Sequence, residues 1–84
     1  MYRKEKQQLE NLNLDNFKPY YLVNNYGFLF EVNGIRYDLR KWNNCYGDEV
    51  SYFTLESTQT TESFDRTFDI IEQVINYLQE LKSL

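Results

Sequence analysis

The side chains of this sequence that could do chemistry are mainly carboxylates, and they gather toward its end. From Asp48 to Leu84 there are eight acids and two bases, whereas the residues before Asp48 hold five acids and seven bases. Clustered carboxylates can bind a hard cation such as Mg²⁺, or they can transfer protons in catalysis. Such a cluster is more often the solvated face of a helix, and that alternative is preferred.

Other kinds of catalytic chemistry lack the residues they need. The sequence has no histidine and one cysteine, Cys45. The commonest general base is therefore missing, and a zinc ion would have too few soft ligands. Neither the GxxxxGKS/T motif nor the GxGxxG motif of phosphate-binding loops is present. We therefore predict a protein that is not an enzyme and that binds no cofactor or metal.

Four of the acids recur every three or four residues in a segment that is predicted to be helical. On a helix, this spacing places consecutive carboxylates on one face about 5–6 Å apart. Neighbouring phosphates are roughly 6–7 Å apart, so the face could enter a basic channel in competition with DNA or RNA. The predicted contact residues are these four acids, a second acidic patch and one aromatic anchor: Glu62, Asp65, Asp69 and Glu72; Asp48, Glu49 and Glu56; and Trp42.

A second candidate site lies around Arg36, Arg40 and Trp42, on a predicted strand that also carries Lys41. Cations beside an aromatic ring could contact the phosphates and stack a base of single-stranded nucleic acid. The same residues can instead form an arginine–tryptophan cation–π pair that covers the edge of a sheet. The net charge of −4, and Asp38 between the two arginines, favour the cation–π pair.

The element that must position these residues is a β-hairpin between residues 28 and 39. Asn33-Gly34 between two alternating runs is typical of a type I′ turn, which needs positive φ at both central residues. A two-residue loop also fixes the register of the strands, so that one face is apolar and the other polar. The expected cross-strand pairs are Val32–Ile35, Glu31–Arg36, Phe30–Tyr37 and Phe28–Leu39.

Helices are expected on both sides of this hairpin, at residues 3–13 and 62–83, because apolar residues recur there at helical spacing. Short strands are expected at residues 20–23, where Pro19 favours an edge position, and at residues 50–56. The predicted fold is α+β. It has an antiparallel sheet of three to four strands, a short N-terminal helix and a long C-terminal helix, in the order α-β-β-β-α.

The apolar residues of the C-terminal helix span about half of its circumference. A small sheet does not cover so wide an arc, so the N-terminal helix or a second subunit is expected to cover the rest. A homodimer is therefore an alternative function, as a structural or regulatory module. Its predicted contact residues are Val74, Tyr77, Leu81 and Leu84.

Length and composition set the class of protein. The 84 residues make one domain, 1–84, and no linker, repeat or low-complexity segment divides the chain. The first residues hold no apolar run typical of a secretory signal, and no stretch approaches the roughly 18 apolar residues of a membrane span. Together with the single cysteine, this predicts a cytoplasmic protein.

The order α-β-β-β-α resembles that of the double-stranded RNA-binding domain. That family docks phosphates on a lysine-rich start of its second helix, whereas Thr61-Glu62-Ser63-Phe64-Asp65-Arg66 has the opposite charge, so that activity is not expected. In size, acidity, aromatic content and element order, the whole chain resembles small phage-encoded inhibitors of host nucleic-acid machinery, anti-CRISPR proteins among them. This resemblance implies an inhibitor that acts in the host cytoplasm by presenting acids where DNA would bind. The partner would be a host protein with a basic nucleic-acid-binding surface.

Overall fold

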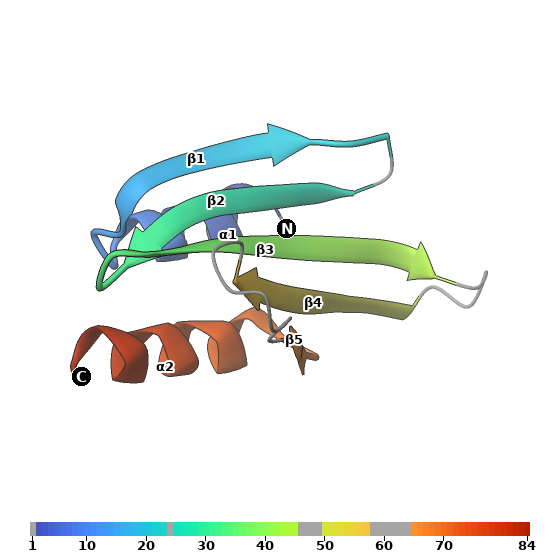
Figure 1. The fold of residues 1–84 in the computed structure, drawn as a ribbon. Helices are drawn as coiled ribbons and strands as arrows, with labels where there is room; N and C mark the ends of the chain where they lie inside the picture. Colours follow the sequence, from blue (N-terminus) through green and yellow to red (C-terminus); the bar gives the residue numbers. More distant parts are fainter. Residues whose placement is uncertain (1, 24, 46–49, 58–64) are drawn as a thin grey trace.

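The computed structural model describes residues 2–23, 25–45, 50–57 and 65–84. Along the chain, one helix precedes five consecutive strands and a second helix follows them (Figure 1). The α+β class is confirmed, but the sheet has five strands where three to four were expected, so the element order differs from that of the double-stranded RNA-binding domain. The elements are α1 (Tyr2–Glu10), β1 (Asp15–Tyr21), β2 (Tyr26–Val32), β3 (Ile35–Cys45), β4 (Val50–Ser57), β5 (Asp65–Phe68) and α2 (Ile71–Lys82).

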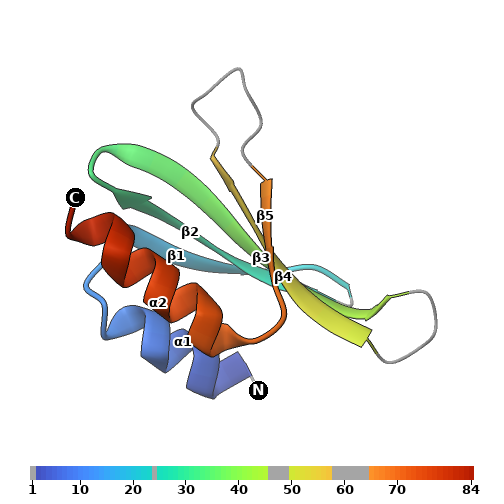
Figure 2. The ribbon, with the colours of Figure 1, turned by 90° about the horizontal axis from the view of Figure 1, so that it is seen from below.

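The five strands form one antiparallel meander in the order β1-β2-β3-β4-β5. Strand β3 is therefore central, and β1 and β5 are the edges. Both helices lie side by side on one face of the sheet, which we call the inner face (Figure 2). The opposite face, called the outer face, carries no helix from the part of the chain that the structure describes.

The hairpin of β2 and β3 has the predicted register, from Val32 opposite Ile35 to Phe28 opposite Leu39. Its turn is formed by Asn33 at φ 53° and Gly34 at φ 81°. Both residues are thus in the left-handed region, as a two-residue turn of this type requires. The alternation sends most of the apolar side chains to the inner face, and most of the charged ones and Trp42 to the outer face. Lys41, on the inner face, and Leu29, on the outer face, are the exceptions.

Strand β1 begins earlier than the predicted strand and contains Pro19, which lies opposite Phe28. A proline is tolerated there because β1 is an edge strand. The register shifts between Asp15 and Lys18. Asn16, inside that shift, has φ 53°, which Asn adopts more readily than most residues. The predicted edge position is confirmed, although the strand ends at Tyr21.

The C-terminal helix begins at Ile71, and the prediction that it begins at residue 62 is wrong. Residues 65–68 form β5 instead, with Phe68 opposite Phe53 of β4. The apolar spacing of Phe64, Phe68 and Ile71 fits a helix, but Phe68 also fits the period-two alternation of a strand. Pairing with β4 supplies these residues with backbone hydrogen bonds and buries Phe68, so the strand is formed.

The start of α2 is marked by its backbone. Ile70 is extended, with φ −135° and ψ 158°, and it provides no side-chain cap. The amide of Asp69 donates a hydrogen bond of 2.8 Å to Gln73 Oε1. Gln73 is the third helical residue, and its side chain thus accepts a hydrogen bond from the residue just before the N-cap Ile70.

The core lies between the inner face and the two helices. Leu9 of α1 and Leu78 of α2 are fully buried there against Phe28, Phe53 and Leu39 of the sheet. Burying each of these side chains is worth roughly 1.5–3 kcal/mol. Such a layer of large side chains lets a short chain form one stable core.

The predicted homodimer stripe on α2 is mostly covered within one chain. Val74 is fully buried in the core. Tyr77 and Leu81 are partly buried against it. Leu84, just beyond the helix, is 91% exposed. The uncovered arc that motivated a dimer through α2 is therefore occupied by the sheet and α1.

Charged contacts fix both helices to the rest of the fold. Glu5 of α1 is buried, with one carboxylate oxygen 3.5 Å from Lys41 Nζ on β3. The Tyr26 hydroxyl donates a hydrogen bond to its other oxygen. At the end of α2, Lys82 Nζ donates to the carbonyl of Leu12. The two helices are thus held over the sheet by polar as well as apolar contacts.

Candidate functional site

The outer face carries a continuous stack of three aromatic rings and one arginine. The guanidinium carbon of Arg40 lies 5.1 Å from the ring centroid of Trp42 and 6.0 Å from that of Tyr20. Trp42 stacks in turn on Tyr52, with centroids 6.4 Å apart and planes inclined by 21°. Trp42 Nε1–H donates a hydrogen bond of 3.0 Å to Thr54. The stack therefore extends from β1 over the central strand to β4, and its rings are half-buried.

Polar contacts hold the stack in place. The Tyr20 hydroxyl donates to Asp38 Oδ1 at 2.6 Å and accepts a hydrogen bond from Arg40 Nε at 3.2 Å. The guanidinium of Arg40 is also 3.6 Å from Asp38 Oδ2. Burial and the bond to Asp38 raise the pKa of Tyr20. The hydrogen bond with Tyr20 raises the pKa of Arg40. The charge of Arg40 is thus already engaged within the face.

Three acids occupy one row across β3, β4 and β5, next to this stack. Asp38 pairs with Glu56 in the backbone register, and Glu56 pairs with Asp65. Directly opposed residues of adjacent strands lie roughly 5 Å apart, where like charges repel each other. Glu56 is exposed. Glu56 thus places a negative charge opposite Asp38, which is itself paired with Arg40.

Toward β1, the outer face has a different character. Lys18, Leu29 and Arg36 line a shallow hollow of about 320 Å³. Arg36 lies opposite Glu31 in the register of β2 and β3. A partner that covers the outer face thus meets Lys18, Glu31 and Arg36 around this hollow. It also meets the aromatic stack and the exposed Glu56 of β4.

The predicted acidic helix face is wrong. Asp65 lies on β5, Asp69 lies between β5 and α2, and Glu72 alone of the described acids in this set is on the helix. Strand residues rise roughly 3.3 Å each, so Asp65 and Asp69 are about 13 Å apart along the chain direction. Glu62 lies outside the described residues. These acids therefore do not form one row along a helix.

Two other predicted contact residues, Trp42 and Glu56, both lie on the outer face. They belong to different rows, because Trp42 is opposite Tyr52 in the register. The predicted cation–π pair of Arg40 and Trp42 is confirmed, although it lies on the central strand and not at an edge. The predicted acids Asp48 and Glu49 lie outside the described residues.

Sequence reasoning missed Tyr20 and Tyr52 as members of the site. Tyr52 could have been found from alternation, since it is on the side of its strand opposite to Phe53. Tyr20 gave no such signal, because its place depends on how β1 pairs with β2 and on the small size of Gly27.

Three further findings bear on the site. Within residues 2–23, 25–45, 50–57 and 65–84, no group of three His, Cys, Asp or Glu side chains is placed to hold a metal ion. None of the helices in these ranges has the length and apolar character needed to cross a membrane. A comparison of the chain with protein families, curated proteins and solved structures found no match.

Proposed function

We propose that this chain is a non-enzymatic binding protein that docks its outer face on a basic, nucleic-acid-binding surface of a host protein. Blocking that surface would make it an inhibitor of the phage-encoded, anti-CRISPR type. One observation carries the proposal: the stacked rings of Trp42 and Tyr52 lie half-exposed on the outer face, where none of the described helices packs, and they lie beside the row that includes Glu56.

The chemistry of the face fits arginine side chains. Proteins contact nucleic-acid backbones mainly through Arg and Lys. A guanidinium stacks on the face of a Trp or Tyr ring and also pairs with carboxylates. Trp, Tyr and Arg dominate the residues that carry binding energy at protein interfaces. Trp42 and Tyr52 would therefore act as anchors, and Glu56 would supply the charge.

A second function, the binding of single-stranded nucleic acid, draws on the same rings. Bases stack on aromatic side chains that protrude from open sheets. Arg40, however, is already engaged by two rings and by Asp38. The carboxylates of Asp38 and Glu56 would also repel phosphates. The protein-binding function is preferred for these two reasons.

Trp42 is the sole tryptophan of the chain, so its fluorescence reports directly on the outer face. The protein is titrated with a peptide of alternating Arg and Gly, as a probe for a basic surface, and with oligothymidylate, as a probe for single-stranded DNA. We expect the peptide to change the Trp42 emission, less so at high salt, and the oligonucleotide to have no effect. The reverse result would establish the second function. If neither probe changes the Trp42 emission, the outer face is excluded as the binding surface.

Matched charge variants test the role of Glu56. Glu56→Gln removes one acid from the outer face, whereas Glu80→Gln makes the same change at an exposed position of α2. We expect Glu56→Gln to weaken peptide binding about fivefold, as for the loss of one exposed ion pair. Glu80→Gln should have no effect. Equal weakening by both variants would mean that binding follows net charge alone.

The natural partner can be sought with a nuclease-treated pull-down from bacterial lysate, read by mass spectrometry. The proposal is supported if the unchanged protein captures one DNA- or RNA-handling protein in stoichiometric amount. The Glu80→Gln variant should capture the same protein, and the Trp42→Ala variant should not. If Trp42→Ala, shown to be folded by circular dichroism, captures the same protein equally well, the outer face is not the inhibitory surface.

A further inference from the structure

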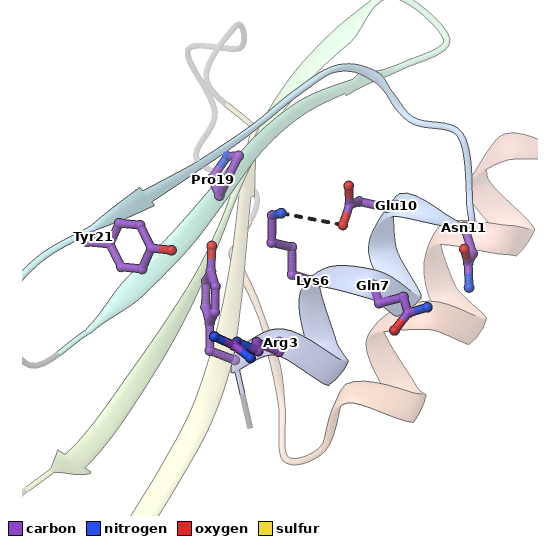
Figure 3. A pocket seen from close by; sticks show the side chains of 8 residues that line it. Arg3, Lys6, Gln7, Glu10, Asn11, Pro19 and Tyr21 are labelled. Atoms are coloured by element: carbon purple, nitrogen blue, oxygen red, sulfur yellow. Dashed lines mark ion pairs between the residues drawn. The ribbon is translucent and has the colours of Figure 1, made fainter.

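A groove lies between α1 and the edge strand β1, on the inner side of the sheet. One side of α1 forms one wall, Pro19 and Tyr21 of β1 form the other, and its volume is about 690 Å³ (Figure 3). Tyr2 of α1 contacts Tyr21 across the groove, with ring centroids 5.1 Å apart. Directly after Tyr21, the chain exposes Leu22 and Val23, the latter by 98%. The groove thus follows the edge of the sheet toward an apolar turn.

The edge of β1 offers backbone hydrogen-bonding groups beside this groove. Leu22 N–H donates to the carbonyl of Asn25 at 2.8 Å, which makes this pair of the β1–β2 hairpin a hydrogen-bonded one. In an antiparallel ladder such pairs alternate with pairs that are not bonded. Counting back along the regular part of β1, the backbone groups of Tyr21 and Pro19 then face away from β2. Proline has no N–H, so these two residues offer one donor and two acceptors.

The α1 wall of the groove is cationic, although the protein as a whole is acidic. Glu5 is 5% exposed and points to Lys41 on the sheet, so its charge does not reach the groove. Arg3 and Lys6 line the groove. Lys6 is paired with Glu10 at 3.6 Å. The inward orientation of Glu5 therefore leaves an excess of positive charge along the first two turns of α1.

We propose that this groove, called the α1–β1 groove, binds an extended acidic peptide segment of a partner protein, which adds a strand to the sheet beside β1. Strand addition is a general mode of peptide recognition, in which main-chain hydrogen bonds give affinity and alternate side chains give specificity. Apolar side chains of the added strand contact Tyr2 and Tyr21. Its carboxylates meet Arg3 and Lys6. This site is separate from the outer face and does not depend on its function.

A second copy of the chain fits the edge less well than a partner peptide. Two β1 strands that pair with each other would each bring Pro19 to the shared edge, so both would lack a donor. A proline on an edge strand is a common device against such self-pairing. A foreign strand without proline loses one hydrogen bond at most, and it can carry the acids that the groove favours.

The probe for this site is a labelled, end-capped hexapeptide in which every second residue faces the groove; Glu and Val take these positions in turn, and Thr fills the positions between them. Its binding is measured by fluorescence polarisation with the whole protein. A peptide with Lys in place of Glu tests the charge preference. A peptide N-methylated at alternate residues, in either phase, tests the backbone hydrogen bonds. We expect the Glu–Val peptide to bind, and both the Lys–Val peptide and one N-methylated peptide to bind at least about tenfold more weakly.

Neighbouring residues of α1 provide matched variants. Arg3→Glu reverses a charge in the groove, whereas Lys4→Glu makes the same reversal at an exposed position that does not line it. We expect about tenfold weaker binding with Arg3→Glu and little change with Lys4→Glu. In NMR spectra, the amide signal of Tyr21 should shift when the peptide binds. Thermal unfolding of both variants confirms that they are folded.

Three results would overturn the proposal. The first is no binding of the Glu–Val peptide at all. The second is equal weakening by Arg3→Glu and Lys4→Glu, which would indicate unspecific attraction by the basic end of α1. The third is undiminished binding of both N-methylated peptides, which would show that no strand is added to β1.

Discussion

The phenol ring of Tyr20 lies over the backbone of Gly27, its cross-strand partner in the β1–β2 ladder. A β-carbon added to Gly27 would overlap the Tyr20 ring, so close approach requires glycine at this position. From there the Tyr20 hydroxyl reaches Asp38 and Arg40 on β3. The ring thus links an edge strand to the central strand over the strand between them.

The first prediction concerns this contact. Gly27→Ala should lower the free energy of unfolding by about 1–2 kcal/mol, because it displaces Tyr20 and its hydrogen bonds. Urea unfolding measures the change. In a Tyr20→Ala background, the same substitution should be neutral or stabilising, since alanine is roughly 0.5–1 kcal/mol better than glycine inside a strand. Equal costs in both backgrounds would show that the ring is not the cause.

The second prediction concerns the buried ion pair of Glu5 and Lys41. Glu5→Ala leaves the Lys41 ammonium, whose side chain is only 13% exposed, without this carboxylate. The cost should reach about 3–5 kcal/mol in the free energy of unfolding, as for a broken buried pair. The double variant Glu5→Ala/Lys41→Met should recover part of that loss, because it removes both charges. Chemical denaturation of the three proteins provides the comparison. A double variant less stable than Glu5→Ala would contradict this account.

The third prediction concerns alkaline pH. Burial raises the pKa of Tyr2 to about 12, and burial, aided by the bond to Glu5, also raises the pKa of Tyr26. Unfolded tyrosine ionises near about pH 10. Above that pH the folded state holds protons that the unfolded state has lost, so stability declines as pH rises through about 12 and is unaffected by these groups below about pH 10.

The melting temperature, followed by circular dichroism from pH 8 to pH 12, tests this sign. Tyr26→Phe should make the alkaline decline shallower, because one of the raised tyrosines is then missing. A melting temperature that stays constant or rises over this interval would be inconsistent with the burial of these hydroxyls.

The fourth prediction compares two exposed acids. Glu56 lies opposite Asp38 in the register of β3 and β4, so Glu56→Gln should stabilise the free protein by about 0.2–1 kcal/mol. Glu72 lies in the first turn of α2, where a negative charge favours the helix, so Glu72→Gln should destabilise by about 0.3–1 kcal/mol. Thermal unfolding at low salt measures both. Shifts of the same sign would refute the acidic row as a source of repulsion.

Part of the fold could be predicted from the sequence. The β2–β3 hairpin was accessible because turn chemistry and alternation favour the same register. The start of α2 was not, because Phe68 fits both a helical and a strand period, and only pairing with β4 decides between them. Strand β1 was underestimated because Asn16 and Pro19 both disfavour strands, and its pairing with β2 outweighs them.

The candidate site was less accessible than the fold. The sequence shows where the acids are in the chain. Which residues lie opposite them in the sheet depends on the registers of β3, β4 and β5. Asp38 and Glu56 are distant in the chain and adjacent in the sheet. The pairing of Arg40 with Trp42 could be predicted because these residues alternate on one strand, whereas the placement of Tyr20 required three strands at once.

The meander described above also bears on how the chain folds as it is made. Each strand pairs with its neighbours in sequence, so the sheet can grow hairpin by hairpin during synthesis, with the low contact order that favours fast folding. The helices are the exception, since α1 emerges first and α2 last, and the core needs both. Until α2 has been synthesised and packs on the sheet, the phenylalanines of the inner face remain exposed, so they can bind chaperones or aggregate.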